Sequence, residues 1–501
     1  MIFIMEDNKQ MKLGFDNDKY VKIQSEKIRE RFKLFDKLYL EIGGKLFEDN
    51  HAARVLPGFK PDAKINMFLE LKDDLEIIFC INANDIERHK TRADYGITYD
   101  IEILRLIENS KAKGFTVNSV VITLYNSQPS VNSFINKLKR LGIKTYTHHK
   151  IDGYPEDINK IVSDEGYGSN PYIKTTKPLI LVNAPGPGSG KLATCLSQLY
   201  HEHKLGVNAG YAKFETFPVW NLPLKHPVNL AYEAATADIK DVNMIDPYHL
   251  EKYGISTVNY NRDIETFPVL KATLSKITGK DIYFSPTDMG VNMIASAIID
   301  EDVVINSAKK EIMRRLYQER CNLKMELGDE EAVQKVKMLV SELDISEDIL
   351  PAVKAAIDKA NTSDRHAVAI ELADGRIITG RETDLLSPAS SAIINTMKEI
   401  TRIPDEIDLL SDTILKPILN IKKEALASEY KTLQLQEVLI ALSICAVTNP
   451  VIKKALNNLS KLNGNDAHST YIVTGDDAKV LKNLKINLTS EPVFYNDNLN
   501  K

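Results

Sequence analysis

Cysteine is scarce in this chain, and no two cysteines lie close together. The 501 residues contain four of them, at Cys80, Cys195, Cys321 and Cys445. This spacing excludes a zinc site built from paired cysteines, and it is unlike the dense cysteine frameworks of small secreted domains. Because all four lie in apolar or helical stretches, we expect buried thiols and a reducing compartment.

Long hydrophobic runs are also missing. No stretch reaches the roughly 18 consecutive apolar residues that a membrane helix needs. Residues 1–5 are apolar, but two acidic residues follow at once, which argues against a signal peptide. Met5 and Met11 are alternative starts, so residues 1–11 are expected to be dispensable. We therefore expect a soluble, cytoplasmic protein with no membrane partner.

Neither sign of charge predominates. The chain has 64 Lys and Arg against 69 Asp and Glu, which gives a net charge of −5. Without a basic excess, we expect no nucleic-acid partner. Hydrophobic residues make up 43% and charged residues 27%, the composition of an ordinary globular protein. Disorder and coiled coil are therefore excluded for the chain as a whole.

Strand-like apolar runs alternate with helical runs through the first two thirds of the sequence. Buried strands are predicted at 38–42, 75–81, 117–125, 143–146 and 178–184, and helices at 20–37, 96–113, 131–141 and 192–204. Such alternation is typical of the α/β class with a mostly parallel sheet, Rossmann-like or P-loop-like. Residues 302–359 are almost wholly helical.

Length and these patterns suggest about three domains. We expect an N-terminal α/β lobe at 12–170, a P-loop-like α/β lobe at 171–330 packed with it, and a helical connector at 331–360. A smaller α+β domain is expected at 361–501, opened by a hairpin at Asp374-Gly375.

A glycine-rich run, PGPGSGK at 185–191, lies between a predicted strand and a predicted helix. Glycines let backbone N–H groups approach phosphate oxygens, and the helix N-terminus adds positive potential. The lysine would supply a charge for a terminal phosphate. The run predicts a site for a nucleotide or another phosphorylated ligand, formed by Gly186, Gly188, Ser189, Gly190 and Lys191.

This run departs from the phosphate loop GxxxxGK[ST] in two places. Pro185 stands where the first glycine is expected, and Leu192 replaces the hydroxyl residue that binds magnesium. Thr194 lies about one helical turn past Lys191, too far to substitute. Bound magnesium is therefore not expected. A tight turn without a ligand, a site for another anion and an active-site loop of a different kind are the alternatives.

Polar segments follow the predicted strands, where ligands of α/β sheets bind. Arg88, Lys90 and Arg92 form a basic cluster after the strand at 75–81, and Arg262 lies in a second polar segment. We expect these four side chains to be secondary contacts of the phosphorylated ligand. Solvated loops and internal salt bridges are the alternatives.

Other polar residues have simpler interpretations. Asp246 and Asp288 follow strand-like runs, as a magnesium-binding acid would, but turn or helix-capping carboxylates are favoured. His148 and His149 are adjacent on a strand and are predicted at the surface.

His201-Glu202-His203 does not form a metalloprotease motif. The second histidine of HExxH must lie four residues after the first, and Leu205 occupies that position. The two histidines lie about 200° apart on a helix, so they cannot bind one ion. No zinc site is predicted.

Long segments of the chain resemble a known family. LILVNAPGPGSGKLATCLSQLYHE, YAKFETFPVWNLPLKHPVNLAYEAATADIKDVNMIDPYHL, VNYNRDIETFPVL and FSPTDMGVNM are similar to a conserved bacterial family of unknown function. The resemblance extends from Met11 over the rest of the chain. It implies a large N-terminal α/β region, a C-terminal domain and a homo-oligomer. Some members are labelled ATP-dependent zinc proteases, a label that the histidine spacing does not support.

The segment 367–397 is similar to the opening of cytidine-deaminase-like folds, in which a zinc ligand and a Glu begin the first helix. Here that helix would begin at residues 387–391, SPASS, which offer neither, and the later PCxxC is absent. An unrelated α+β domain used for assembly is the favoured alternative.

Three functions remain open from the sequence. The first is a ligand-binding enzyme or switch with phosphotransfer or hydrolysis at the glycine-rich run. The second is a non-catalytic scaffold that forms homo-oligomers. The third is an enzyme for phosphorylated metabolites that uses no nucleotide.

Overall fold

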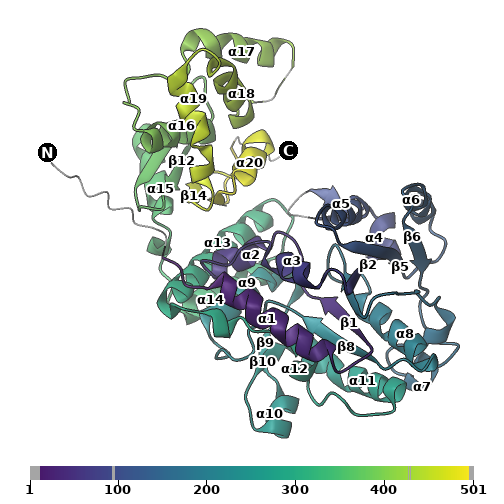
Figure 1. The fold of residues 1–501 in the computed structure, drawn as a ribbon. Helices are drawn as coiled ribbons and strands as arrows, with labels where there is room; N and C mark the ends of the chain where they lie inside the picture. The colour runs from purple at the N-terminus through teal and green to yellow at the C-terminus, as the bar shows by residue number, and fades with distance from the viewer. Residues whose placement is uncertain (1–11, 93–95, 427, 429, 496–501) are drawn as a thin grey trace. The chain divides into compact units, whose positions relative to one another are not determined.

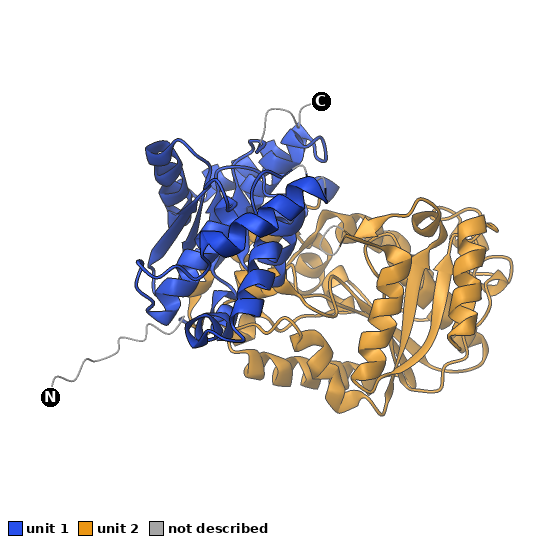
Figure 2. Ribbon diagram, turned by 90° about the horizontal axis from the view of Figure 1, so that it is seen from above, with its two compact units in different colours: residues 1–12, 234–240, 306–501 blue, residues 13–233, 241–305 orange. Residues whose placement is uncertain are grey.

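The computed structural model describes residues 12–92, 96–426, 428 and 430–495. These residues form two compact units (Figure 2). The N-terminal unit consists of 13–233 and 241–305. The C-terminal unit combines 306–495 with the short segment 234–240. The alternative starts at Met5 and Met11 lie outside the described residues.

In the described part of the N-terminal unit, seven parallel strands form one sheet (Figure 1). In spatial order they are β11 (Gly290–Val291), β8 (Ala209–Phe214), β1 (Lys37–Ile42), β7 (Leu179–Asn183), β2 (Leu75–Asn82), β5 (Thr116–Thr123) and β6 (Lys144–Thr147). The prediction of an α/β fold with a mostly parallel sheet is confirmed. Strands from both sides of residue 170 belong to this one sheet.

Helices cover both faces of the sheet, because alternate residues of the buried strands point to opposite sides. Leu40 and Leu181 face a core shared with α1 (Asn17–Phe32), α3 (Ala63–Met67), α5 (Tyr99–Ala112) and α6 (Pro129–Arg140). Tyr39 and Ile180 face the opposite core, shared with α8 (Lys191–Lys204) and α11 (Asn261–Thr278).

Strand β7 lies between β1 and β2, although it follows both in the chain. The segment after β1 leads through α2 (Asn50–Val55) to α3 on one face of the sheet, whereas β7 leads directly into α8 on the other. Adjacent strands whose connections leave to opposite faces leave a crevice at their carboxyl ends. The glycine-rich run begins at this crevice.

The C-terminal unit contains a smaller mixed sheet in the described residues. Its strands are β13 (Ile377–Arg381), β12 (Ala367–Glu371), β14 (Asp466–Ser469) and β15 (Asn487–Ser490). The predicted hairpin joins β12 to β13, with Gly375 at a φ of 86°. β14 and β15 are parallel, and the other pairs are antiparallel. This α+β arrangement agrees with the expected class.

Helices of the C-terminal unit include α15 (Pro351–Ser363), α16 (Pro388–Thr401), α18 (Leu435–Cys445) and α20 (Gly475–Asn483). α16 lies close against β13, since a Cβ on Gly380 would be 2.0 Å from the backbone N of Ala392. α18 buries Leu435 and Leu442 and exposes Ile440 and Ile444.

The remaining helices and strands connect these layers. They are β3 (Thr91–Arg92), β4 (Ile97–Thr98), β9 (Asn243–Ile245), β10 (Val258–Tyr260), α4 (Ala83–Glu87), α7 (Ile158–Ile161), α9 (Pro227–Ala235), α10 (Pro247–Tyr253), α12 (Pro286–Met289), α13 (Glu301–Lys324), α14 (Glu330–Glu342), α17 (Asp412–Glu424) and α19 (Pro450–Asn457). Across the residues that the structure describes, none of the helices is both long and apolar enough to cross a membrane.

Candidate functional site

The loop between β7 and α8 depends on glycine at two positions. Gly188 and Gly190 have φ values of 73° and 82°, in the left-handed region that disfavours residues with a Cβ. Gly190 is the N-cap of α8, and Lys191 is the first helical residue. A Cβ on Gly190 would lie 2.6 Å from Cγ2 of Thr123, whereas one on Gly188 would meet nothing within 4 Å.

Side-chain hydrogen bonds hold the loop through its carbonyl groups. Ser189 Oγ donates to the carbonyl of Gly186 at 2.9 Å, and Thr123 Oγ1 donates to the carbonyl of Ser189 at 3.0 Å. Asn82 Nδ2 donates to the carbonyl of Gly188 at 3.2 Å. These bonds order the loop without using any of its backbone N–H groups.

Several N–H groups of the loop are therefore available. Within the described residues, the backbone N–H groups of Gly188 and of residues 190–192 have no hydrogen-bond acceptor, whereas that of Ser189 turns back toward the carbonyl of Gly186. The first turn of any helix leaves such groups. Here Gly188 adds a further such group upstream of the N-cap, in a loop with two left-handed glycines. Consecutive N–H groups of this kind attract anions.

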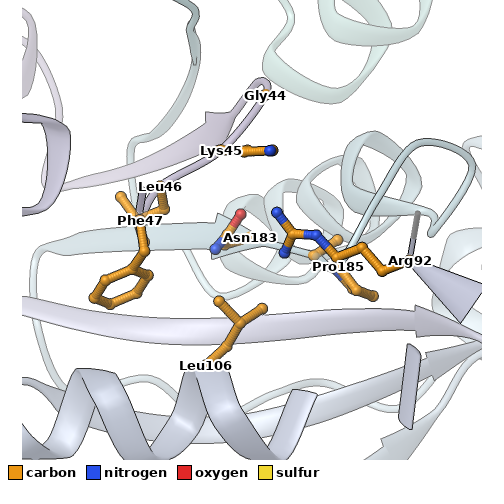
Figure 3. Close-up of a pocket in the computed structure, with 9 residues that line it drawn as sticks. Gly44, Lys45, Leu46, Phe47, Arg92, Leu106, Asn183 and Pro185 are labelled. Atoms are coloured by element: carbon orange, nitrogen blue, oxygen red, sulfur yellow. The ribbon is translucent and has the colours of Figure 1, made fainter. Parts of the chain in front are cut away.

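A small cavity opens beside the loop, at the crevice between β1 and β7 (Figure 3). Its volume of ≈ 20 Å³ has room for about one water-sized group, such as a phosphoryl oxygen. Its polar side chains are Lys45, Asn183 and Arg92, and its apolar ones include Phe47 and Leu106. The residues after β1, the residues after β7 and one basic residue of the predicted cluster therefore meet here.

The three basic residues after β2 have different positions. Arg92 lines the cavity and forms an ion pair with the buried Glu102. Lys90 lies 4.9 Å from the ring centroid of Tyr99, and the Tyr99 hydroxyl is 2.2 Å from where a Cβ on Gly186 would be. Lys90 therefore approaches the loop across an aromatic ring.

Arg88 and Arg262 are more distant from the loop. Arg88 is 64% exposed and forms an ion pair with Asp85, which also lies 3.6 Å from Lys90. Arg262 pairs with Asp241 at 2.9 Å at the start of α11. No contact between Arg262 and the loop is found in the described residues, which corresponds to the salt-bridge alternative.

A buried ionic cluster lies at the carboxyl ends of β1 and β8, and sequence reasoning missed it. Lys191 Nζ lies 3.9 Å from Glu41 Oε1, and Tyr211 donates a hydrogen bond of 2.8 Å to Glu41 Oε2. Lys213 Nζ lies 2.7 Å from Asp263 and 3.0 Å from Glu215. We call Glu41, Lys191, Lys213, Glu215 and Asp263 the ionic cluster.

Burial makes the ionisation of this cluster unusual. It raises the pKa of Glu215 to about 7, with Lys213 opposing the shift and Asp263 adding to it. Burial alone would lower the pKa of Lys213, but Asp263 and Glu215 outweigh it, so the pKa is raised and the amine stays charged. Buried ionic groups contribute little net stability, and perturbed groups gather at functional sites.

One signal in the sequence could have located part of the cluster. Tyr211, Lys213 and Glu215 alternate along β8 and just beyond it, so they point to the same face of a buried strand. Charged residues on a buried face need partners. Their partners come from β1 and α11, far away in the sequence.

A second buried pair supports the segment after β1. Lys64 Nζ lies 2.9 Å from Asp49 Oδ2, with side chains 1% and 10% exposed. Lys64 also donates to the carbonyl of Gly43 at 3.4 Å. The turn that leads into the cavity is thus held by a charged group in the core.

The simpler polar predictions can now be compared with the structure. Asp246 caps α10 by accepting the N–H groups of Tyr248 and His249, and Asp288 accepts the N–H of Phe284 at 2.8 Å, so both are confirmed as cap and turn residues. The surface prediction was wrong for His148, which is 3% exposed and whose pKa burial lowers to about 4.

The two helical histidines do not converge. His201 contacts the carbonyl of Asn170 at 2.8 Å, and His203 contacts that of Ala209 at 2.9 Å. In the part of the chain that the structure describes, no group of three or more His, Cys, Asp or Glu side chains could hold a metal ion.

Comparisons with known proteins confirm the resemblance noted in the sequence. Two family models, "Domain of unknown function DUF1846, N-terminal" and "Domain of unknown function DUF1846, C-terminal", match residues 13–344 and 348–500. The chain is 52% identical to UPF0371 proteins of Clostridium tetani (strain Massachusetts / E88) and Clostridium botulinum (strain ATCC 19397 / Type A). Each alignment covers 98% of this chain and 99% of the relative.

Proposed function

This chain belongs to the DUF1846 family, and from the geometry of its site we propose that it binds a phosphorylated ligand at residues 186–191. The ligand is a nucleotide or another phosphorylated metabolite. The single observation that carries the proposal is the group of N–H donors at Gly188 and residues 190–192 that have no acceptor within the described residues, beside the crevice where β7 lies between β1 and β2.

Charge near the loop supports an anionic ligand. Lys191 begins α8, and Lys45 and Arg92 line the adjoining cavity. The amine of Lys90 lies over the ring of Tyr99. Lysine and arginine beside a helix N-terminus are the usual partners of phosphate oxygens. The loop is also ordered by Ser189, Thr123 and Asn82, so binding would cost little conformational entropy.

Two residues in the first turn of α8 bear on whether magnesium takes part in ligand binding. Leu192 has no hydroxyl group to offer a cation, and Thr194 Oγ1 donates to the carbonyl of Gly190 at 2.9 Å, within the first turn of α8. We therefore expect phosphate binding that does not require magnesium. Phosphotransfer or hydrolysis is proposed by analogy alone, with a non-catalytic ligand-binding protein as its alternative.

Thermal-shift measurements on the full chain test the proposal. Inorganic phosphate, pyrophosphate, adenine and guanine nucleotides and sugar phosphates would each be added with and without magnesium. We expect at least one of them to raise the Tm in a concentration-dependent way, because a ligand that binds only the folded state stabilises it. If none shifts the Tm beyond a chloride control of equal ionic strength, the proposal is wrong.

A further inference from the structure

Lys191 is held loosely by its carboxylate partner. The separation of 3.9 Å from Glu41 lies at the outer limit of a direct ion pair, and the Lys191 side chain keeps 15% of its exposure. Glu41 is held more firmly, because its other oxygen accepts a hydrogen bond of 2.8 Å from the hydroxyl group of Tyr211. An anion bound at the start of α8 would compete with Glu41 for the lysine.

The ionic cluster has more carboxylates than lysines. Lys191 and Lys213 oppose Glu41, Glu215 and Asp263, so a fully ionised cluster carries one buried negative charge. Lys64 and Asp49 form a separate neutral pair. Asp241, which acts on the same tyrosines as Glu215, is paired with Arg262 at 2.9 Å. The neutral titratable groups beside the cluster are hydroxyls and thiols: Tyr211 on β8, Cys80 on β2, Cys195 on α8, Tyr232 on α9 and Tyr260 on β10.

Burial raises the pKa of each of these neutral groups, so none of them offsets the excess charge near neutral pH. A buried negative charge without a partner is costly, and the usual remedy is a bound proton. Glu215 is the carboxylate in the cluster that can carry it near neutral pH.

We propose that the ionic cluster takes up one proton when an anion binds at the glycine-rich loop. An anion at the loop draws Lys191 away from Glu41, and the cluster restores its charge balance by taking one proton from solvent onto Glu215. No other bond forms or breaks in this step. The inference rests on the proposed function, because the displacing anion is the phosphate of the ligand.

Proton uptake by the ionic cluster would place an acid near the bound ligand. After the exchange, a protonated carboxyl group lies just beyond the carboxyl end of β8, at the same edge of the parallel sheet as the start of the glycine-rich loop. Such a group is what general acid catalysis needs to protonate an oxygen that leaves or becomes negative in the transition state. The cluster thus favours a phosphorylated metabolite whose conversion requires a proton, over a ligand that is only held.

The direction of the pH effect follows from the ionisation of Glu215. At pH 8 this carboxyl group is mostly ionised before the anion binds, so loss of Lys191 as a neighbour can drive protonation. At pH 6 it already holds its proton, so little more is taken up. Proton uptake on binding should therefore be larger at pH 8 than at pH 6.

Isothermal titration calorimetry with sulfate tests this, because sulfate does not titrate in this pH range. Titration of the full chain in two buffers of different ionisation enthalpy gives the number of protons taken up. We expect uptake of about one proton per anion at pH 8 and clearly less at pH 6. Glu215→Gln should reduce the uptake at pH 8, and Glu41→Gln should tighten sulfate binding several-fold, an effect that a structural role would not produce.

Glu202→Gln provides the matched control. Glu202 is also a buried glutamate paired with a lysine, Lys37 at 2.8 Å, but the pair lies where β1 begins, at the opposite end of the sheet. This variant should keep the proton uptake of the unmodified protein. Sulfate binding without proton uptake at either pH would overturn the inference and leave the proposed function standing. Absence of any binding by sulfate and by phosphate would overturn both.

Discussion

A Cβ atom on Gly190 would lie 2.6 Å from Cγ2 of Thr123, the last residue of β5, two strands away from β7 in the sheet. The hydroxyl group of Thr123 also donates a hydrogen bond to the carbonyl of Ser189, the residue before Gly190. The glycine-rich loop is thus shaped by a distant strand of the sheet and does not depend on a ligand for its conformation.

This contact predicts different effects for two glycine substitutions. Gly188→Ala should cost about 1 kcal/mol of the free energy of unfolding, because only backbone strain opposes it. Gly190→Ala combines the same strain with a collision and should cost more, and it should also remove phosphate-dependent stabilisation. Urea unfolding and thermal shifts measure both quantities. Equal losses in the two variants would contradict this account of the loop.

Lys191→Met should abolish the rise in Tm caused by phosphate, because the variant keeps the length of the side chain and removes its charge. Lys204→Met is the matched control, since Lys204 ends the same helix and pairs with the exposed Asp164. Its phosphate response should equal that of the unmodified protein. A full response in Lys191→Met would exclude Lys191 from the site.

The raised pKa of Glu215 predicts how the stability of the folded protein changes with pH. Its pKa is raised from 4.5 to about 7 in the folded protein, so its contribution to stability is complete below pH 4.5 and is lost as the pH rises through 7. Glu215→Gln stays neutral at every pH. Its Tm relative to that of the unmodified protein should therefore increase between pH 5 and pH 8. A constant difference across this range would show that Glu215 ionises normally.

The thiols should differ in reactivity. Burial raises the pKa of Cys80 and of Cys321 to about 12 and that of Cys195 well above its ordinary value, so their reactive thiolates are scarce. Cys445 is only half-buried. Iodoacetamide should modify Cys445 first in the native protein, as followed by peptide mass spectrometry. Modification of Cys80 at a similar rate would contradict the buried position.

Local patterns predicted much of the N-terminal unit. Apolar β-branched runs located β2, β5 and β7, and glycine after a buried strand located the loop at 186–191. Alternation of polar and apolar residues could not reveal the strand order, because pairing of β7 between β1 and β2 depends on contacts over more than a hundred residues. That order decides which residues meet at the cavity.

The contacts of other polar residues show the same limit of sequence patterns. Arg262 pairs with Asp241, and the two come together because β9 and β10 pair antiparallel between them. His148 directly follows β6 and is buried, with its backbone bonded to Ile122 in β5 and to Tyr125 just beyond it, which its local sequence of polar residues does not suggest. The ionic cluster was missed for a related reason, because its members come from β1, α8, β8 and α11.

The short segment 234–240 has a consequence for dissecting the protein. It belongs to the C-terminal unit, where Lys240 pairs with Glu331 at 2.7 Å and Arg315 donates to the carbonyl of Ala235 at 2.9 Å. A gene fragment ending at 305 would therefore carry this segment without its partners, and a fragment starting at 306 would lack it. Truncation at a single position therefore cannot yield either unit intact.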